Sequence, residues 1–439
     1  MSSSINPSNA AIRLKVLGAR ATRGTFRAHG CSRLIFAVDA ETLKPLQVRW
    51  QYEGDAAWKV GASWRDDQPH RPLAAETDVD LVRLNPANII GNGASQSSEV
   101  SGAFVALRGD RSLVAWGTDG FGASIPEPMP TDVAEVSATQ SAHAARTPEG
   151  NLTVWGNVQE GGSLGGLPTT GYAQVIGNLN AFAAMTLGGQ LKAWGNPLVG
   201  GNVPAPISDY LDIKSIHSSG RAFAAIRKTG HVVAWGSPSW GGALPGEIAE
   251  LTDIVQITGT SGAFAALRAN GSERRLVSWG HEGFGGLMPE ELGSLTDIDE
   301  LACANTGAFA ALQNGNVWVW GDPDSGGEQG SLPEMRGVVS ICASEYTFVA
   351  LQADGHVVGW GGSASAIPIP TDIAALDDIV QLAATRNAFA ALRRTGQVVR
   401  WDASGGNVLP FNNAQAIYAG AASFTALTAQ GRGEELGPT

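Results

Sequence analysis

Residues 222–245 read AFAAIRKTGHVVAWGSPSWGGALP, and residues 388–410 repeat the pattern as AFAALRRTGQVVRWDASGGNVLP. Each copy begins with a short apolar segment, passes through a polar turn that ends in glycine, and returns as a second apolar segment with a tryptophan. Two apolar segments joined by such a turn predict a β-hairpin. A glycine-rich loop follows, and a further apolar segment such as 253–257 leads into the next copy. The unit therefore contains at least three strands.

The tryptophans of these copies recur with one period along most of the chain. Eight of them are separated by 39, 39, 41, 44, 41, 40 and 41 residues: Trp116, Trp155, Trp194, Trp235, Trp279, Trp320, Trp360 and Trp401. In seven units a phenylalanine precedes the tryptophan by 11 to 15 residues, and His143 takes that position in the second unit. A period of about 40 residues made of strands and turns fits the blades of a β-propeller. We predict an all-β fold with a closed β-propeller; eight blades are favoured, and seven or nine stay open.

The residue types within a unit predict how it packs. The small residues of the AFAAL segments suit the crowded innermost strands, and phenylalanine and tryptophan suit the wedge between blades. A ninth unit begins at Phe424 and has Leu436 in the tryptophan position. Because a closed ring joins its ends, we expect this degenerate unit to complete a blade with residues near 95–104. The 57 glycines among 439 residues, about twice the usual share, fit the many tight turns that such a ring needs.

Residues 1–92 lack the repeat and show alternating apolar segments at 13–17, 34–38, 47–52 and 79–84. Alternation of this kind predicts β-strands. We expect a small β-sandwich-like module over 1–92, followed by the propeller over 93–439. The alternative is that Phe36 and Trp50 mark a diverged repeat.

Composition and charge exclude several classes of protein. The net charge is -12, with 29 Lys and Arg against 41 Asp and Glu, so the basic footprint of nucleic-acid binding is missing. No apolar run is long enough to span a membrane. The first 24 residues lack the apolar core of a secretory signal, and we expect a soluble protein that is cytoplasmic or exported by a non-Sec route. The three cysteines, Cys31, Cys303 and Cys342, are expected to be free buried thiols; the alternative is a disulfide between Cys303 and Cys342, which occupy the same position in adjacent units.

The repeated pattern ALxxxGxVxxWG with its Gly-Gly loop resembles the regulator of chromosome condensation repeat, and the resemblance covers about residues 97–437. That family folds as a seven-bladed propeller, and these short units are similar to its compact bacterial version. Members include a nucleotide-exchange factor, enzyme inhibitors, photoreceptors and effectors, all of which work through protein contacts. The resemblance therefore implies a protein-binding propeller without choosing a partner.

No pattern for catalysis or cofactor binding stands out. The chain contains no HExxH metal motif and no phosphate-binding loop. The stretch GGSLGG at 161–166 contains the letters G-x-S-x-G, but we expect it to be a propeller loop and not the strand-to-helix turn that carries a catalytic serine. His231 and His356 lie in equivalent hairpin turns, where solvated histidines are expected. We expect no enzyme activity, no metal and no cofactor.

The loop between the tryptophan and the paired glycines differs in sequence from unit to unit. A fixed scaffold with variable loop tips is the arrangement of a binding surface. The candidate contact residues at these tips are Phe121, Glu160, Trp240, Phe284 and Asp324. The aromatic rings could instead fold over the blade edges and cover core. We expect a propeller that binds a protein partner through these loops; the alternative is a carbohydrate-binding or toxin-like exported protein of bacterial origin.

Overall fold

The computed structural model describes residues 14–20, 34–66, 68–69, 71–86, 88–93, 102–271, 273–362, 366–409, 411, 413–428 and the backbone of 433–436. Strands form nearly all of its regular structure. The α-helices are single turns, α1 (Gly246–Ala249), α2 (Glu290–Gly293) and α3 (Thr371–Ala374), and short 3-10 turns include η5 (Ile207–Asp209) and η9 (Gln329–Ser331). Over the part of the chain that the structure describes, no helix has the length and apolar character needed to cross a membrane.

From residue 88 onward the described strands form nine small antiparallel sheets in chain order. Each has three strands except the eighth, which has four. Their strands, sheet by sheet, are β8 (Asn88–Gly91), β9 (Ala103–Leu107), β10 (Leu113–Gly117); β11 (Glu135–Ala138), β12 (Ala142–Arg146), β13 (Leu152–Gly156); β14 (Tyr172–Gly177), β15 (Ala181–Thr186), β16 (Leu191–Gly195); β17 (Ile213–Ser218), β18 (Ala222–Arg227), β19 (Val232–Gly236); β20 (Ile254–Gly259), β21 (Ala263–Asn270), β22 (Glu273–Gly280); β23 (Glu300–Cys303), β24 (Ala308–Gln313), β25 (Asn316–Gly321); β26 (Val338–Ala343), β27 (Thr347–Gln352), β28 (Val357–Gly361); β29 (Ile379–Ala384), β30 (Ala388–Arg393), β31 (Val398–Asp402), β32 (Gly405–Val408); β33 (Ala414–Ala419), β34 (Phe424–Thr428), β35 (Gly433–Leu436).

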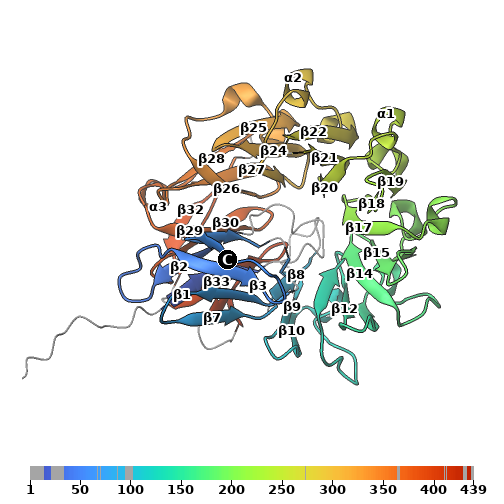
Figure 1. Ribbon diagram of the computed structural model, residues 1–439, viewed down its shortest axis with the longest axis horizontal. Coiled ribbons are helices and arrows are strands. Elements are labelled where there is room, and N and C mark those ends of the chain that lie inside the picture. Colours follow the sequence, from blue (N-terminus) through green and yellow to red (C-terminus); the bar gives the residue numbers. More distant parts are fainter. Residues whose placement is uncertain are drawn as a thin grey trace, which may run out of the picture.

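Figure 1 shows these sheets following one another around a central axis, as the blades of a β-propeller do. The first strand of each sheet contacts the first strand of the next, and β33 contacts β8. The innermost strands are therefore segments such as β20. The prediction that the AFAAL segments lie innermost is wrong, because these segments are the middle strands of their sheets.

The ninth unit also differs from its prediction. We expected it to complete a sheet with residues near 95–104, but β33, β34 and β35 form a sheet of their own, and β9 pairs with β8. A separate sheet is possible because the ninth unit carries all three strands. The segment 94–101 lies outside the described residues.

Backbone hydrogen bonds connect neighbouring sheets at equivalent loops, between each first and second strand. Each joins the amide N–H of one loop to a carbonyl oxygen of the next. The pairs are Gly93 to Gln140, Gln140 to Leu179, Leu179 to Gly220, Gly220 to Thr260, Ser261 to Asn305, Asn305 to Ser344, Glu345 to Arg386, Arg386 to Ala421, and Ala421 to Asn92. The last bond, with an N···O distance of 3.4 Å, joins the ninth sheet to the first.

The phenylalanine and tryptophan of each unit face each other across a hairpin. Phe223 on β18 lies directly opposite Trp235 on β19, and their rings stack at 5.4 Å. Phe264 and Trp279 make the same pair although they are 15 residues apart, because the extra residues extend the hairpin beyond the pair. His143 stacks on Trp155 in the same way, at 5.4 Å. The variable spacing in the sequence therefore comes from the turn, and the pair itself is constant.

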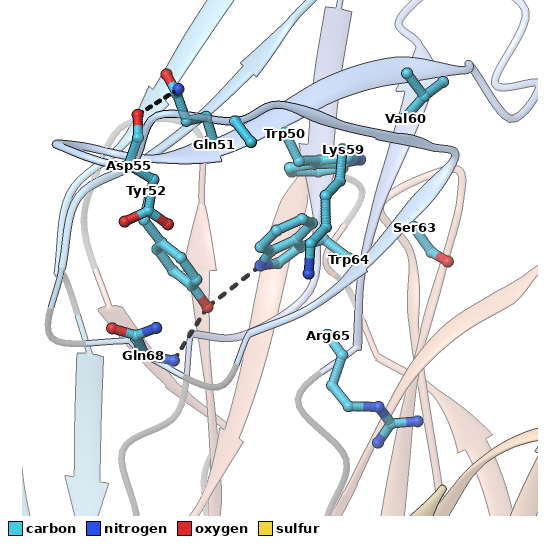
Figure 2. A pocket seen from close by; sticks show the side chains of 11 residues that line it. Trp50, Gln51, Tyr52, Asp55, Lys59, Val60, Ser63, Trp64, Arg65 and Gln68 are labelled. Carbon is cyan, nitrogen blue, oxygen red and sulfur yellow. Dashed lines mark hydrogen bonds between the residues drawn. The ribbon is translucent and has the colours of Figure 1, made fainter. Parts of the chain in front are cut away.

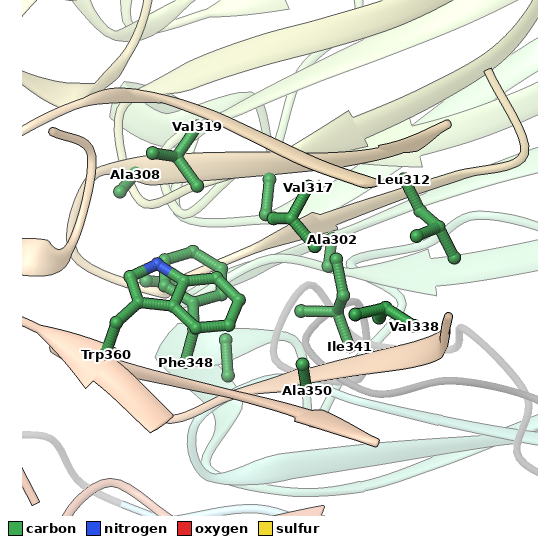
Figure 3. Packing of buried hydrophobic residues seen from close by; sticks show 13 residues of the cluster. Ala302, Ala308, Leu312, Val317, Val319, Val338, Ile341, Phe348, Ala350 and Trp360 are labelled. Carbon is green, nitrogen blue, oxygen red and sulfur yellow. The ribbon is translucent and has the colours of Figure 1, made fainter. Parts of the chain in front are cut away.

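Packing between sheets buries these rings. In Figure 3 the Phe348 and Trp360 rings of one sheet lie against small residues of the preceding sheet, among them Ala302 and Ala308. Phe348 is fully buried and Trp360 is 5% exposed. Alanines are needed at the facing positions because two sheets this close leave little space between them. The prediction that the rings fill the wedge between neighbouring sheets is confirmed.

The N-terminal residues form two further sheets that share one cluster of buried side chains, which includes Ile35, Trp50 and Leu73. One sheet has the order β1-β2-β5 and the other β4-β3-β6-β7. Their bounds are β1 (Leu14–Leu17), β2 (Leu34–Asp39), β3 (Val48–Tyr52), β4 (Lys59–Gly61), β5 (Ser63–Arg65), β6 (Leu73–Glu76) and β7 (Leu81–Leu84). The four predicted strands are present as β1, β2, β3 and β7. Phe36 and Trp50 lie in different sheets, so they are not a diverged repeat pair.

The N-terminal sheets contact the repeat sheets at one end of the central axis. The Gly18 amide donates to the carbonyl of Gln415 at the start of β33, and Arg65 pairs with Glu300 at the start of β23. The glycine-rich loops leave from the opposite end of the sheets, where the third strands end in Trp-Gly. We call that end the loop face and the other end the turn face. The N-terminal sheets thus leave the loop face uncovered.

The cysteines differ in part from expectation. Cys303 is buried and its thiol donates to the carbonyl of Gly259 at 3.2 Å, as expected for a thiol in the core. The expectation is wrong for Cys342, which is disulfide-bonded. Cys31 lies outside the described residues.

Candidate interaction surface

Six loops on the loop face share one conformation. Each forms a 3-10 turn immediately after Trp-Gly and one capping residue: η2 (Asp119–Phe121), η3 (Val158–Glu160), η4 (Pro197–Val199), η6 (Pro238–Trp240), η7 (Glu282–Phe284) and η8 (Pro323–Ser325). In four of them the side chain before the turn accepts a hydrogen bond from the amide two residues later, as Asn157 does from Gln159. These caps satisfy amides that a short turn leaves unpaired.

A glycine ends every one of these turns in the left-handed region, with φ between 85° and 103°. At Gly241 the chain also passes close to the next sheet, and a Cβ there would come within 2.8 Å of the Phe264 ring. A Cβ on the following Gly242 would come within 2.7 Å of the Gly236 backbone. The paired glycines of the sequence are thus explained by both backbone conformation and close approach.

The next sheet holds each loop through its tryptophan. The indole N–H of Trp279 donates to the carbonyl of Gly241 at 3.1 Å. Five other loops make the same bond at 2.9 to 3.3 Å: Trp155 to Gly122, Trp194 to Gly161, Trp235 to Gly200, Trp320 to Gly285 and Trp360 to Gly326. In four loops the third residue of the turn is fixed as well, because its carbonyl accepts a hydrogen bond from a side chain of its own sheet. The Phe284 carbonyl accepts from Thr260 at 2.9 Å, and the carbonyls of Phe121, Val199 and Trp240 accept in the same way. These loops are therefore rigid supports for their side chains.

Two of the predicted contact residues lie together. The rings of Trp240 and Phe284, from adjacent loops, are 4.7 Å apart, and His281 lies 5.2 Å from the first and 5.1 Å from the second. The Arg221 guanidinium stands 4.3 Å from the Trp240 ring centroid, within the range of a cation–π contact. We call these four residues the rim cluster.

The rim cluster is only half-buried. Arg221 and His281 are exposed, whereas the two rings are of intermediate exposure. Beneath them lies Gly262, where a Cβ would come within 2.4 Å of Trp240 and 3.0 Å of Phe284. The rings thus cover backbone with one face and leave part of their surface to solvent.

The other three predicted residues occupy equivalent loop positions but lie apart from the rim cluster. Phe121 is half-buried, and its carbonyl accepts from Asn92 at 2.8 Å. The Glu160 carboxylate accepts from the Ser141 hydroxyl. Asp324 is exposed, and its amide donates to Asp322 at 3.1 Å. The structure therefore brings together Trp240 and Phe284 and leaves the remaining three on separate loops.

Sequence reasoning missed Arg221 and His281. His281 occupies the capping position that Asn157, Asn196 and Asp322 fill in other units, and this alignment is visible in the sequence. Arg221 gives no such signal, because it reaches Trp240 from a different loop, between β17 and β18.

Three of the described histidines, His143, His231 and His356, have structural environments. His143 is buried, and burial lowers its pKa to about 3. His231 contacts Thr229 at 2.9 Å, and His356 contacts Asp354 at 3.2 Å, both in exposed hairpin turns. Within the described residues no three His, Cys, Asp or Glu side chains gather as a metal site requires.

No family model matches the chain, and no curated protein matches it. Solved structures to which it is similar include the ectodomain of the receptor kinase CR4 from Physcomitrella patens, at 17% identity over 66% of this chain and 76% of that one, with a TM-score of 0.42. The CRINKLY WD40 ectodomain of ACR4 from Arabidopsis thaliana is 14% identical over 72% and 96%, with a TM-score of 0.40. Prp20p from Saccharomyces cerevisiae is 16% identical over 56% and 74%, with a TM-score of 0.34.

Proposed function

We propose that this chain is a non-enzymatic interaction protein that holds a protein partner on its loop face. The observation that carries the proposal is a constant loop backbone with a variable third position. Six loops share the same turn and glycine, yet the third residue changes from aromatic to aliphatic, acidic or hydroxyl: Phe121, Glu160, Val199, Trp240, Phe284 and Ser325. Rigid supports with varied tips suit recognition of a surface.

Charge on these loops favours a basic partner. Asp119, Glu282 and Asp324 are exposed on the loop face, and the chain carries a net charge of -12. Negative charge of this kind steers a positive surface toward the loops and disfavours an acidic one. The rim cluster supplies an aromatic contact, of the kind that carries much of the binding energy at protein interfaces.

The scaffold that supports this function is proposed to be one closed ring of nine blades, built from units of the regulator of chromosome condensation type. The hydrogen bond from Ala421 to Asn92 and the contact of β33 with β8 support closure. The N-terminal module over 1–92 is proposed as a separate part that docks on the turn face. Strand β8 (Asn88–Gly91), at the end of that range, pairs with β9 of the first repeat sheet.

The test replaces Phe121, Trp240 and Phe284 together by alanine. We expect the triple variant to lose capture of the partner that the wild-type protein retains in stoichiometric amount at moderate salt, while its melting temperature changes little. The matched control replaces three exposed apolar residues away from these loops, Leu187, Leu211 and Val408, and should keep capture intact.

Equal capture by the triple variant and the wild type would contradict the proposal. A large fall in melting temperature would instead show that the three rings are parts of the core. If the wild type bound glycans in an array and the triple variant did not, the loops would be carbohydrate sites and the alternative function would replace the proposed one.

A further inference from the structure

A second surface lies in the N-terminal module, on the turn face. A half-open pocket of about 400 Å³ is formed there by β3, β4, β5 and the segments that flank them. This volume falls in the range of about 300–1,000 Å³ that small-ligand sites occupy. Figure 2 shows Trp64 and Tyr52 among its lining side chains, with Lys59 beside the indole ring.

The Trp64 ring is held in place from behind. Its indole N–H donates to the Tyr52 hydroxyl at 3.3 Å, and its ring stacks on Trp50 at 6.1 Å. The Tyr52 hydroxyl in turn donates to Asp66 at 2.8 Å, and Asp66 is fully buried in an ion pair with Arg20. Trp64 itself is of intermediate exposure. The pocket therefore offers an apolar ring face that is already in position.

Burial and the charge of Asp66 raise the pKa of Tyr52 to about 12. Its hydroxyl therefore keeps its proton throughout the physiological range, and the hydrogen bonds that hold Trp64 persist with it.

The charges in the pocket leave one cation available. Asp55 pairs with Arg71 at 2.7 Å, and Arg65 pairs with Glu300 at 2.6 Å. Lys59 makes no ion pair with any described residue, and its ammonium lies 5.5 Å from the Trp64 ring centroid. Side-chain amides of Gln51 and Gln68 and the hydroxyl of Ser63 complete the polar lining. A ligand that fits would have one apolar face, several hydroxyl groups and a single negative charge.

We propose that this pocket binds a hexuronic-acid unit of an acidic saccharide, with a C–H face of the sugar ring on Trp64 and the carboxylate on Lys59. The Gln51 amide N–H already donates to the Asp55 carbonyl at 2.7 Å, and the Gln68 amide oxygen accepts from Arg71 at 3.0 Å. The sugar hydroxyls would therefore donate to the Gln51 amide oxygen and accept from the Gln68 amide N–H. One uncompensated ammonium balances one carboxylate, and the net charge of -12 disfavours ligands with more negative charge. The proposal is independent of the proposed function, because the pocket and the loop face lie at opposite ends of the sheets.

The test compares sodium glucuronate with glucose, which has the same ring without the carboxylate, by saturation-transfer NMR and calorimetry on the full chain. We expect glucuronate to bind roughly fivefold more tightly than glucose, the gain of a partly exposed ion pair. Lys59→Gln should remove that preference, and Trp64→Ala should weaken both sugars at least about tenfold. The matched control, Trp58→Ala, removes an exposed neighbouring tryptophan that does not line the pocket and should bind as the wild type does.

Several results would overturn the proposal: no saturation transfer from the protein to glucuronate, equal affinity for the two sugars, an unchanged preference in Lys59→Gln, or equal losses in Trp58→Ala and Trp64→Ala. Tighter binding of benzoate than of glucuronate would show that the site takes aromatic acids instead. If Trp64→Ala fails to fold, the exposed Lys59 still decides the question. The loop-face triple variant should keep glucuronate binding, so failure here and failure of the proposed function are distinguishable.

Discussion

The indole N–H of Trp279 donates to the carbonyl oxygen of Gly241, which belongs to the preceding unit, at a distance of 3.1 Å. One side chain thus fills the wedge between two sheets and fixes the backbone of a loop on the loop face. Six of the eight periodic tryptophans have both roles, and an aliphatic residue could fill the space but could not donate this bond.

Replacing Trp279 by phenylalanine should separate these two roles. The variant keeps an aromatic ring but leaves the buried Gly241 carbonyl without its donor, which costs about 1–3 kcal/mol. We expect a loss of about 2 kcal/mol in the free energy of unfolding, measured by urea denaturation. Trp58→Phe, at an exposed position, is the control and should change stability by less than about 0.5 kcal/mol. Similar losses in both variants would show that the indole bond contributes nothing.

His143 should make the protein sensitive to acid. In the unfolded chain this imidazole takes up a proton near pKa 6.5, whereas burial lowers its pKa in the folded protein to about 3. Between these values the unfolded state binds a proton that the folded state does not. The neutral His143 therefore leaves the free energy of unfolding undiminished above about pH 6.5. That free energy falls as the pH decreases from 6.5 toward 3.

The variant His143→Phe restores the residue found at this position in the eight other units. Both ring nitrogens of His143 are buried without a hydrogen-bond partner among the described residues, and an unpaired buried polar group costs about 1–3 kcal/mol. We expect the melting temperature at pH 7 to rise and its decrease between pH 6.5 and 4 to become shallower. His231→Asn, in an exposed turn, should leave the profile unchanged. A profile for His143→Phe identical to that of the wild type would rule out this origin of acid sensitivity.

The ion pair between Arg65 and Glu300 joins the N-terminal module to the sixth repeat sheet. Glu300 is 6% exposed, so Arg65→Met leaves a buried carboxylate without its partner and should cost about 3 kcal/mol. Replacing both residues by methionine should recover stability to within about 1 kcal/mol of the wild type, because a buried pair gains little over apolar packing. Urea denaturation of the two single variants and the double variant measures the coupling. Additive losses would mean that the two charges do not interact.

Gly262 should control the rim cluster. A Cβ there would come within 2.4 Å of Trp240, so Gly262→Ala must displace the ring, and we expect a cost of about 1–3 kcal/mol and weaker partner capture. The displacement is measured from the indole N–H resonance of Trp240. Gly246→Ala is the matched control, since no atom lies within 4 Å of a Cβ there. An unshifted Trp240 resonance in Gly262→Ala would show that the ring does not rest on this glycine.

The sequence was sufficient for the repeated hairpin, because the Phe–Trp pair is a local feature that recurs with one period. The sequence predicted the wrong innermost strand. The residues of the AFAAL segments are small because they pack against the aromatic rings of the next sheet, and they do not line the axis. Strands β4 and β5, of three residues each, are too short to show alternation, and β6 (Leu73–Glu76) has alanine at both central positions and so shows none. Trp240 and Phe284 were found as variable tips, but Arg221 was not, because its contact depends on the angle between two sheets.

The hydrogen bonds from Gly18 to Gln415 and from Ala421 to Asn92 join the ninth repeat sheet to the N-terminal module and to the first repeat sheet. In an open repeat array each unit contacts only its neighbours, so the number of units can vary. In the closed ring proposed above, removing one unit would separate Ala421 from Asn92. The ring would therefore tolerate substitutions within a unit, such as His143 in the second, better than the loss of a whole unit.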